Sequence, residues 1–128
     1  MSYYFNKVVD LTFEEAIKKV TEELKKEGFG VLTEIDVTGA LKKKINVDFR
    51  KYRILGACNP KFAHKALLEE DKIGTMLPCN VIVQQRADGK IEIAAIDPIA
   101  SMQAIKNEKL GEIASQIQSK LKKVIEKT

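Results

Sequence analysis

The chain is short of the residue types that most often carry chemistry. Its 128 residues include one histidine, two cysteines and no tryptophan. Two cysteines are too few for the disulfide framework of a small secreted protein, and both would remain thiols in a reducing cytosol. No apolar run approaches the ~20 residues that span a bilayer, and no secretion signal is visible at the N-terminus. We therefore expect one cytoplasmic domain over residues 1–128, with no membrane partner.

Arginine is also scarce, since only Arg50, Arg53 and Arg86 stand among the 22 basic residues. Nucleic-acid readers rely on arginine to recognise bases. The densest basic region, residues 42–53, carries no interleaved aromatic platform on which bases could stack. We therefore expect no nucleic-acid partner. The mixture of lysine and glutamate fits a soluble, thermostable surface better.

Apolar periodicity predicts five strands and several helices. The clearest helix follows Thr12, which has capping-box spacing to Glu15. In the second strand, alternation predicts Val31 and Ile35 on one face. Other helices are expected to begin at Thr38, after Asn59-Pro60 and after Asn107. The expected strands cover residues 3–9, 29–37, 52–57, 80–87 and 90–97.

This order of elements predicts an α+β fold, a two-layer arrangement with a mostly antiparallel sheet and helices on one face. Asp88-Gly89 predicts a type I′ turn between the last two strands, and Gly74 is expected to break the chain. The other face of the sheet would stay exposed in a monomer. We expect a second copy of the chain to cover one apolar row of the hairpin, making a homodimer. The candidate row residues are Val81, Val83, Ile91 and Ile93.

The candidate functional residues lie in two short segments at strand ends. Cys58-Asn59 stands in one segment and Cys79-Asn80 in the other, and His64 follows six residues after Cys58. If the segments meet, these five residues would line one small-ligand site. The alternative interpretation is that the cysteines are small buried side chains, because free cysteine is among the most buried residue types.

Two chemistries could use such a site. Cys58 precedes a helix start, where the helix dipole favours a thiolate, so it could be a nucleophile with Cys79 as resolving thiol and His64 as base. Alternatively, Cys58, Cys79 and His64 could bind a soft divalent metal ion. The fourth ligand would then come from Glu34, Asp36, Asp97 or a partner chain. Glu34 and Asp36 could also form a carboxylate pair, although a solvated strand face is the favoured interpretation.

Four segments together resemble a known family. They are residues 29–37, 52–60, 63–67 and 73–83, which hold Gly56-Ala57-Cys58-Asn59-Pro60 and Leu77-Pro78-Cys79-Asn80. In this order they resemble the bacterial and archaeal domain-of-unknown-function family numbered 302. The resemblance covers nearly the whole chain. It implies a small α+β domain that forms dimers, and it implies no established reaction.

The sequence thus favours a non-enzymatic homodimeric domain that binds a small ligand, or a soft metal, near Cys58, Cys79 and His64. A thiol-dependent enzyme or redox protein that uses Cys58 is the second interpretation. The third is an interaction module with no small-molecule site.

Overall fold

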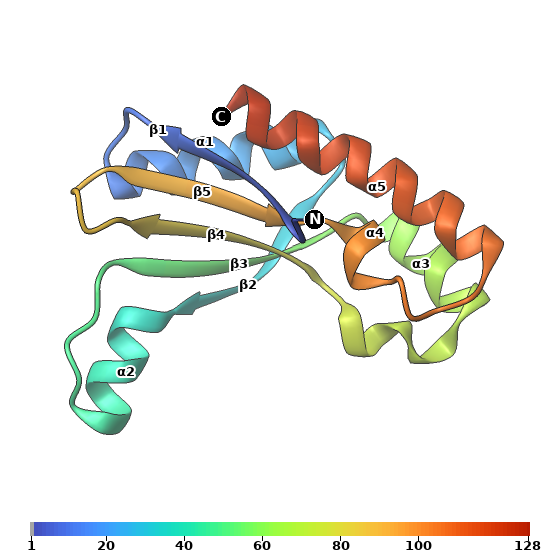
Figure 1. The fold of residues 1–128 in the computed structure, drawn as a ribbon, viewed down its shortest axis with the longest axis horizontal. Coiled ribbons are helices and arrows are strands. Elements are labelled where there is room, and N and C mark those ends of the chain that lie inside the picture. The colour runs from blue at the N-terminus through green and yellow to red at the C-terminus, as the bar shows by residue number, and fades with distance from the viewer. Residues whose placement is uncertain (1) are drawn as a thin grey trace.

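Five strands form one open sheet in the computed structural model, which describes residues 2–128 (Figure 1). The strand order is β1-β5-β4-β3-β2, and every neighbouring pair is antiparallel. The expected α+β class and antiparallel sheet are confirmed. The strands are β1 (Tyr4–Val9), β2 (Gly30–Asp36), β3 (Tyr52–Cys58), β4 (Cys79–Gln85) and β5 (Ile91–Ile96).

Two long helices, α1 (Phe13–Lys26) and α5 (Glu108–Lys127), lie side by side on one face of the sheet (Figure 1). Helix α3 (Pro60–Glu69) packs beside α5. A 3₁₀ helix, η1 (Asp71–Met76), and the short helix α4 (Pro98–Ser101) connect the remaining elements. Helix α2 (Val37–Ile45) stands apart and contacts mainly β2 and β3.

Local sequence explains how the two long helices begin. Thr12 accepts a hydrogen bond from the Glu15 backbone, and the Glu15 carboxylate accepts one from the Thr12 backbone, which completes the predicted capping box. Asn107 caps α5 by accepting from the Leu110 backbone. The predicted apolar stripe of α5 is buried throughout: Leu110, Ile113, Ala114, Ile117, Leu121, Val124 and Ile125.

The core lies between these helices and one face of the sheet. In the hairpin of β4 and β5, alternate side chains point to this face and are buried. Val81, Val83, Ile91 and Ile93 therefore lie beneath the helices. The expectation that this row would need a second copy as cover was wrong, because α1 and α5 already bury it.

A β-bulge corrects the predicted faces of β2. The register shifts between Val31 and Thr33, so Leu32 is the extra residue. Val31 pairs with Ala57 on the core side, whereas Ile35 pairs with Ile54 on the opposite side. The prediction that Val31 and Ile35 share a face was wrong because one inserted residue reverses the alternation.

Two smaller predictions were also wrong in detail. Asp36, not Thr38, caps α2, since its carboxylate accepts from the Gly39 backbone. Thr38 instead donates to the Arg50 carbonyl, which ties the helix to the chain entering β3. Gly74 lies within η1 rather than breaking the chain.

The hairpin turn differs from the predicted type I′ geometry. Only its glycine, Gly89, has a positive φ, of 83°, whereas type I′ requires two such residues. The Gly89 N–H donates to the Arg86 carbonyl, and the Arg86 N–H donates to the Lys90 carbonyl. This pattern fits the three-residue loop with a left-handed glycine at its end.

Candidate functional site

The two cysteine segments lie side by side in the sheet. Ala57 on β3 is the register partner of Cys79 on β4, and Gly56 is the partner of Asn80. The glycine is required by this pairing. A Cβ atom on Gly56 would lie 2.8 Å from the Pro78 ring and would also collide with the Thr33 hydroxyl. Close packing of Gly56 against the Thr33 side chain and the Pro78 ring therefore accounts for the glycine.

The two thiols nevertheless point to opposite faces. Cys79 belongs to the buried row of β4, and its partner Ala57 is buried with it. Cys58 follows Ala57 directly, so strand alternation directs its side chain to the other face. The two thiols are free, and Cys58 is half-buried.

Burial also makes Cys79 unreactive. Burial, with a smaller contribution from the nearby charge of Cys58, raises the pKa of Cys79 from 9.0 to about 11. A thiol with this pKa is almost wholly protonated at neutral pH, and the thiolate is the nucleophilic form. Cys79 is therefore a core side chain by its surroundings.

The structure does not gather the remaining predicted residues around the thiols. His64 lies exposed on α3. Asn59 is buried at the N-cap of α3, but its side chain donates to the Glu27 carbonyl instead of capping the helix. Within residues 2–128, no three histidine, cysteine, aspartate or glutamate side chains form a group that could hold a metal ion. The predicted metal triad is not assembled.

The two carboxylates considered as a pair have structural partners. Glu34 forms an ion pair with Arg53 at 2.6 Å, and Asp36 caps α2. Asp97 caps α4 by accepting from the Ile99 backbone and also accepts from the Gln118 side chain. These contacts fit local structural roles.

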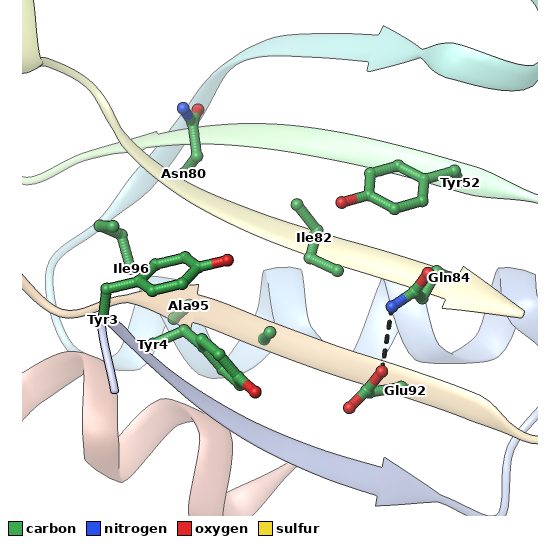
Figure 2. A pocket seen from close by; sticks show the side chains of 10 residues that line it. Tyr3, Tyr4, Tyr52, Asn80, Ile82, Gln84, Glu92, Ala95 and Ile96 are labelled. Atoms are coloured by element: carbon green, nitrogen blue, oxygen red, sulfur yellow. Dashed lines mark hydrogen bonds between the residues drawn. The ribbon is translucent and has the colours of Figure 1, made fainter. Parts of the chain in front are cut away.

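A different site lies on the open face of the sheet, which the helices leave uncovered. A hollow of about 350 Å³ lies across β1, β5, β4 and β3, and Figure 2 shows side chains that line it. All three tyrosines of the chain border it, although Tyr52 is far from the other two in sequence. The complete lining is Tyr3, Tyr4, Tyr52, Asn80, Ile82, Gln84, Glu92, Ala94, Ala95 and Ile96.

The floor of this hollow is apolar and its rim is aromatic. Ile82 on β4 lies between Tyr3 and Tyr52 in Figure 2, and its register partner on β5 is Ala94, which also lines the hollow. The hydroxyls of Tyr3 and Tyr52 point inward over Ile82 from opposite sides (Figure 2). The Tyr3 and Tyr4 rings meet edge to face, with centroids 5.0 Å apart.

A row of hydrogen-bonded polar side chains borders one side of the hollow. The Glu92 carboxylate accepts from the Asn6 amide at 2.8 Å and from the Gln84 amide at 3.0 Å. The Gln84 carbonyl oxygen in turn accepts from Arg50 Nε at 2.9 Å. Each member holds its neighbour in position, so the row presents a fixed pattern of donors and acceptors.

Of the five predicted site residues, only Asn80 lines the hollow. The tyrosines were missed in the sequence because Tyr3 and Tyr4 lie where β1 begins, whereas Tyr52 begins β3. These positions become close only through the strand order of the folded sheet. Strand alternation carried a usable signal. Residues out of phase with the buried row of a half-buried strand mark the open face.

Among residues 2–128, no helix has the length and apolar character that a membrane-spanning segment requires.

The comparisons with known proteins agree on one family. The model described as "Domain of unknown function DUF302" matches residues 5–128. A crystal structure of an uncharacterized conserved DUF302 protein from Bacillus stearothermophilus is 32% identical, with a TM-score of 0.92. That alignment covers 99% of this chain and 98% of the other. No curated protein matches. The chain therefore belongs to the DUF302 family.

Proposed function

We propose that this protein is a non-enzymatic binding domain whose small ligand occupies the tyrosine-lined hollow on the open face of the sheet. The observation that carries this proposal is that all three tyrosines border one hollow. Its volume of about 350 Å³ lies at the lower end of the range of small-molecule sites. The proposal moves the predicted ligand site from the cysteines to the neighbouring open face and keeps Asn80 in it.

The chemistry of the lining supports binding. Ligand sites combine an apolar surface with a few fixed polar groups. Ile82 and Ala94 supply the apolar floor, and Glu92 is held in place by its hydrogen bonds. The tyrosine hydroxyls make no side-chain hydrogen bond within residues 2–128, so they are available to a ligand.

Intrinsic fluorescence offers a direct test. The chain has no tryptophan and every tyrosine borders the hollow, so tyrosine emission reports from this site. We would screen a fragment library by emission and confirm each response by thermal shift. We expect saturable changes accompanied by an increase in Tm.

A pair of variants shows where the ligand binds. Ala94→Leu fills the floor of the hollow, whereas Ala87→Leu makes the same change at an exposed turn. We expect Ala94→Leu to abolish the fluorescence response and Ala87→Leu to retain it. Equal responses in both variants, or no response across the library, would reject the proposed site.

The second chemistry predicted from sequence concerns Cys58, which alternation directs to the open side. A thiol enzyme would require fast alkylation of native Cys58 near neutral pH and loss of reactivity in Cys58→Ser. If the protein is a binding domain, Cys58 needs no activated thiolate, and we expect its alkylation in the native protein to be slow. A fast Cys58 reaction would favour the enzyme instead.

We also propose that a second copy of the chain packs on the arm formed by β2 and α2. Helix α2 has no buried residue, and a nine-residue helix is marginal in water without packing. Its neighbourhood exposes large apolar side chains, including Leu32 at 69% and Ile45 at 62%. The family resemblance implies dimers, and a second copy would cover these side chains.

The charge distribution on the chain is consistent with this pairing. Residues 42–44 of the arm are three lysines. Elsewhere, Leu67 and Leu68 are exposed beside the acidic residues 69–71, which end α3 and begin η1. In a two-fold dimer, each arm would meet this acidic and apolar patch on the other copy.

Sedimentation at micromolar concentration tests the dimer. We expect Ile45→Glu to produce monomers and Val8→Glu, an exposed apolar residue on β1, to remain dimeric. A monomeric native protein would contradict this part of the proposal, and so would an unchanged dimer in Ile45→Glu.

A further inference from the structure

Building on the proposed binding site, we infer that the hollow on the open face binds a small organic cation, such as a quaternary or alkylated ammonium group. Three features of the structure carry this inference. They are the single negative charge in the lining, the tyrosines around it and the engagement of the nearest arginine by other groups.

Among residues 2–128, Glu92 is the only charged residue that lines the hollow. Its Oε2 accepts from Asn6 and its Oε1 accepts from Gln84, so both oxygens are oriented by neutral amides. No lysine or arginine forms a salt bridge with it within residues 2–128. A fixed carboxylate without a cationic partner favours a positively charged ligand.

The tyrosines supply the second element of cation recognition. Aromatic rings attract cations through the negative charge on their faces, and clustered rings are used to bind quaternary ammonium groups. The edge-to-face contact of Tyr3 with Tyr4 fixes these two rings relative to each other. Tyr52 borders the hollow from the opposite side (Figure 2).

Arg50 lies near this site without neutralising it. Its Nε donates to Gln84, and its guanidinium carbon lies 4.4 Å from the Phe49 ring centroid and 5.6 Å from that of Tyr52. Arg50 does not itself line the hollow, although its partners Gln84 and Tyr52 do. Its guanidinium carbon lies within the distance of a cation–π contact with the Tyr52 ring.

The experiment compares a cation with a neutral molecule of the same shape. Choline and tetramethylammonium would be titrated against the full-length protein, with tyrosine emission as the readout. The neutral comparison is 3,3-dimethylbutan-1-ol, which replaces the choline nitrogen by carbon. Sodium chloride at matched concentration controls for ionic strength.

The matched variants are Glu92→Gln and Glu112→Gln. Both remove one negative charge, but Glu112 is an exposed residue of α5 outside the hollow. We expect both cations to bind saturably and the neutral alcohol to bind at least about tenfold more weakly. Glu92→Gln should weaken choline binding by a similar factor, and Glu112→Gln should leave it unchanged.

The outcomes separate this inference from the proposed function. Equal binding of choline and its neutral analogue, or full retention in Glu92→Gln, would overturn the cation inference. If neutral fragments bind and are lost in Ala94→Leu while both cations fail, the binding site stands and its ligand class is wrong. If neither cations nor fragments bind, both proposals are rejected.

Discussion

The two faces of the sheet come from the same strands but have opposite character. On β4 and β5, one set of alternate residues is buried under α1 and α5, including Val81, Val83 and Ile93. The other set, including Asn80, Gln84 and Glu92, lines an open hollow. The covered face is mainly apolar, whereas the open face mixes apolar, aromatic and hydrogen-bonding groups.

This difference indicates a division of roles. Burial of apolar surface contributes stability roughly in proportion to the area removed from water. The covered face therefore accounts for most of the stability that the sheet contributes. Substitutions on the open face should therefore cost the protein little stability, so this face can carry a binding site.

The largest effect expected is for a large-to-small change on the covered face. Ile93 is fully buried on β5, whereas Ile82 is only partly buried on the open side of β4. We expect Ile93→Ala to lower the free energy of unfolding by about 2–5 kcal/mol and Ile82→Ala by less than about 1.5 kcal/mol. Denaturant unfolding of both variants measures the difference.

Similar losses of unfolding free energy in Ile93→Ala and Ile82→Ala would contradict the difference between the two faces, because they would mean that the open face is also packed in solution. Repeating the pair at several protein concentrations would then show whether a second copy supplies that packing.

Sequence periodicity predicted the helices over the covered face well. The whole stripe of α5 and the capping box at Thr12 were correct, because each depends on residues close together in the chain. The open face was harder to predict. No single segment of the sequence shows a pattern for this face, because its polar and aromatic residues come from four different strands.

The errors have specific physical causes. One extra residue at Leu32 reversed the faces of β2, and alternation alone cannot reveal a bulge. The cysteine segments do pair, as the predicted site required, but Cys79 pairs with Ala57 and not with Cys58, so the thiols lie on opposite faces. The tyrosine hollow depends on β1 pairing with β5, which no local pattern encodes.

The next effect concerns the close approach of backbone and ring beside the cysteines. We expect Gly56→Ala to lower the free energy of unfolding by about 1–3 kcal/mol, because its Cβ would collide with Thr33 and Pro78. Gly30→Ala is the matched control on neighbouring β2, since a Cβ there meets no atom within 4 Å. Thermal or denaturant unfolding compares the two. Equal stability would refute the packing explanation for this glycine.

A smaller effect distinguishes the two thiols by pH. Burial raises the pKa of Cys79 to about 11 from 9.0, so the folded protein retains a proton that the unfolded chain releases. The stability that the protonated Cys79 thiol contributes is therefore fully present below pH 9 and is lost as the pH rises toward 11. Between pH 8 and 10 we expect Cys79 to contribute a loss of about 1 kcal/mol.

Denaturant unfolding at both pH values isolates this contribution when variants are compared. Cys79→Ala should lose that part of the pH dependence, although it also loses packing at every pH. Cys58→Ala should retain most of the native slope, because burial, and not the charge of Cys58, is the larger cause of the raised Cys79 pKa. A slope that follows Cys58 instead would reverse the assignment of the buried thiol.

The smallest expected effect on stability is at the tyrosine rim, where the open face differs most from the covered one. The Tyr52 hydroxyl has no side-chain hydrogen-bond partner within residues 2–128, so Tyr52→Phe should change the free energy of unfolding by less than about 0.5 kcal/mol. Tyr52→Ala should weaken ligand binding more than Tyr52→Phe, since the phenylalanine retains the aromatic ring that a cation would contact. Denaturant unfolding and choline titration of the two variants measure these effects separately. A large loss of stability in Tyr52→Phe would show that the hydroxyl is structural, whereas equal binding by both variants would remove this ring from the site. The expected result is that stability is preserved in Tyr52→Phe and binding is reduced in Tyr52→Ala, because the open face carries little of the packing that stabilises the fold.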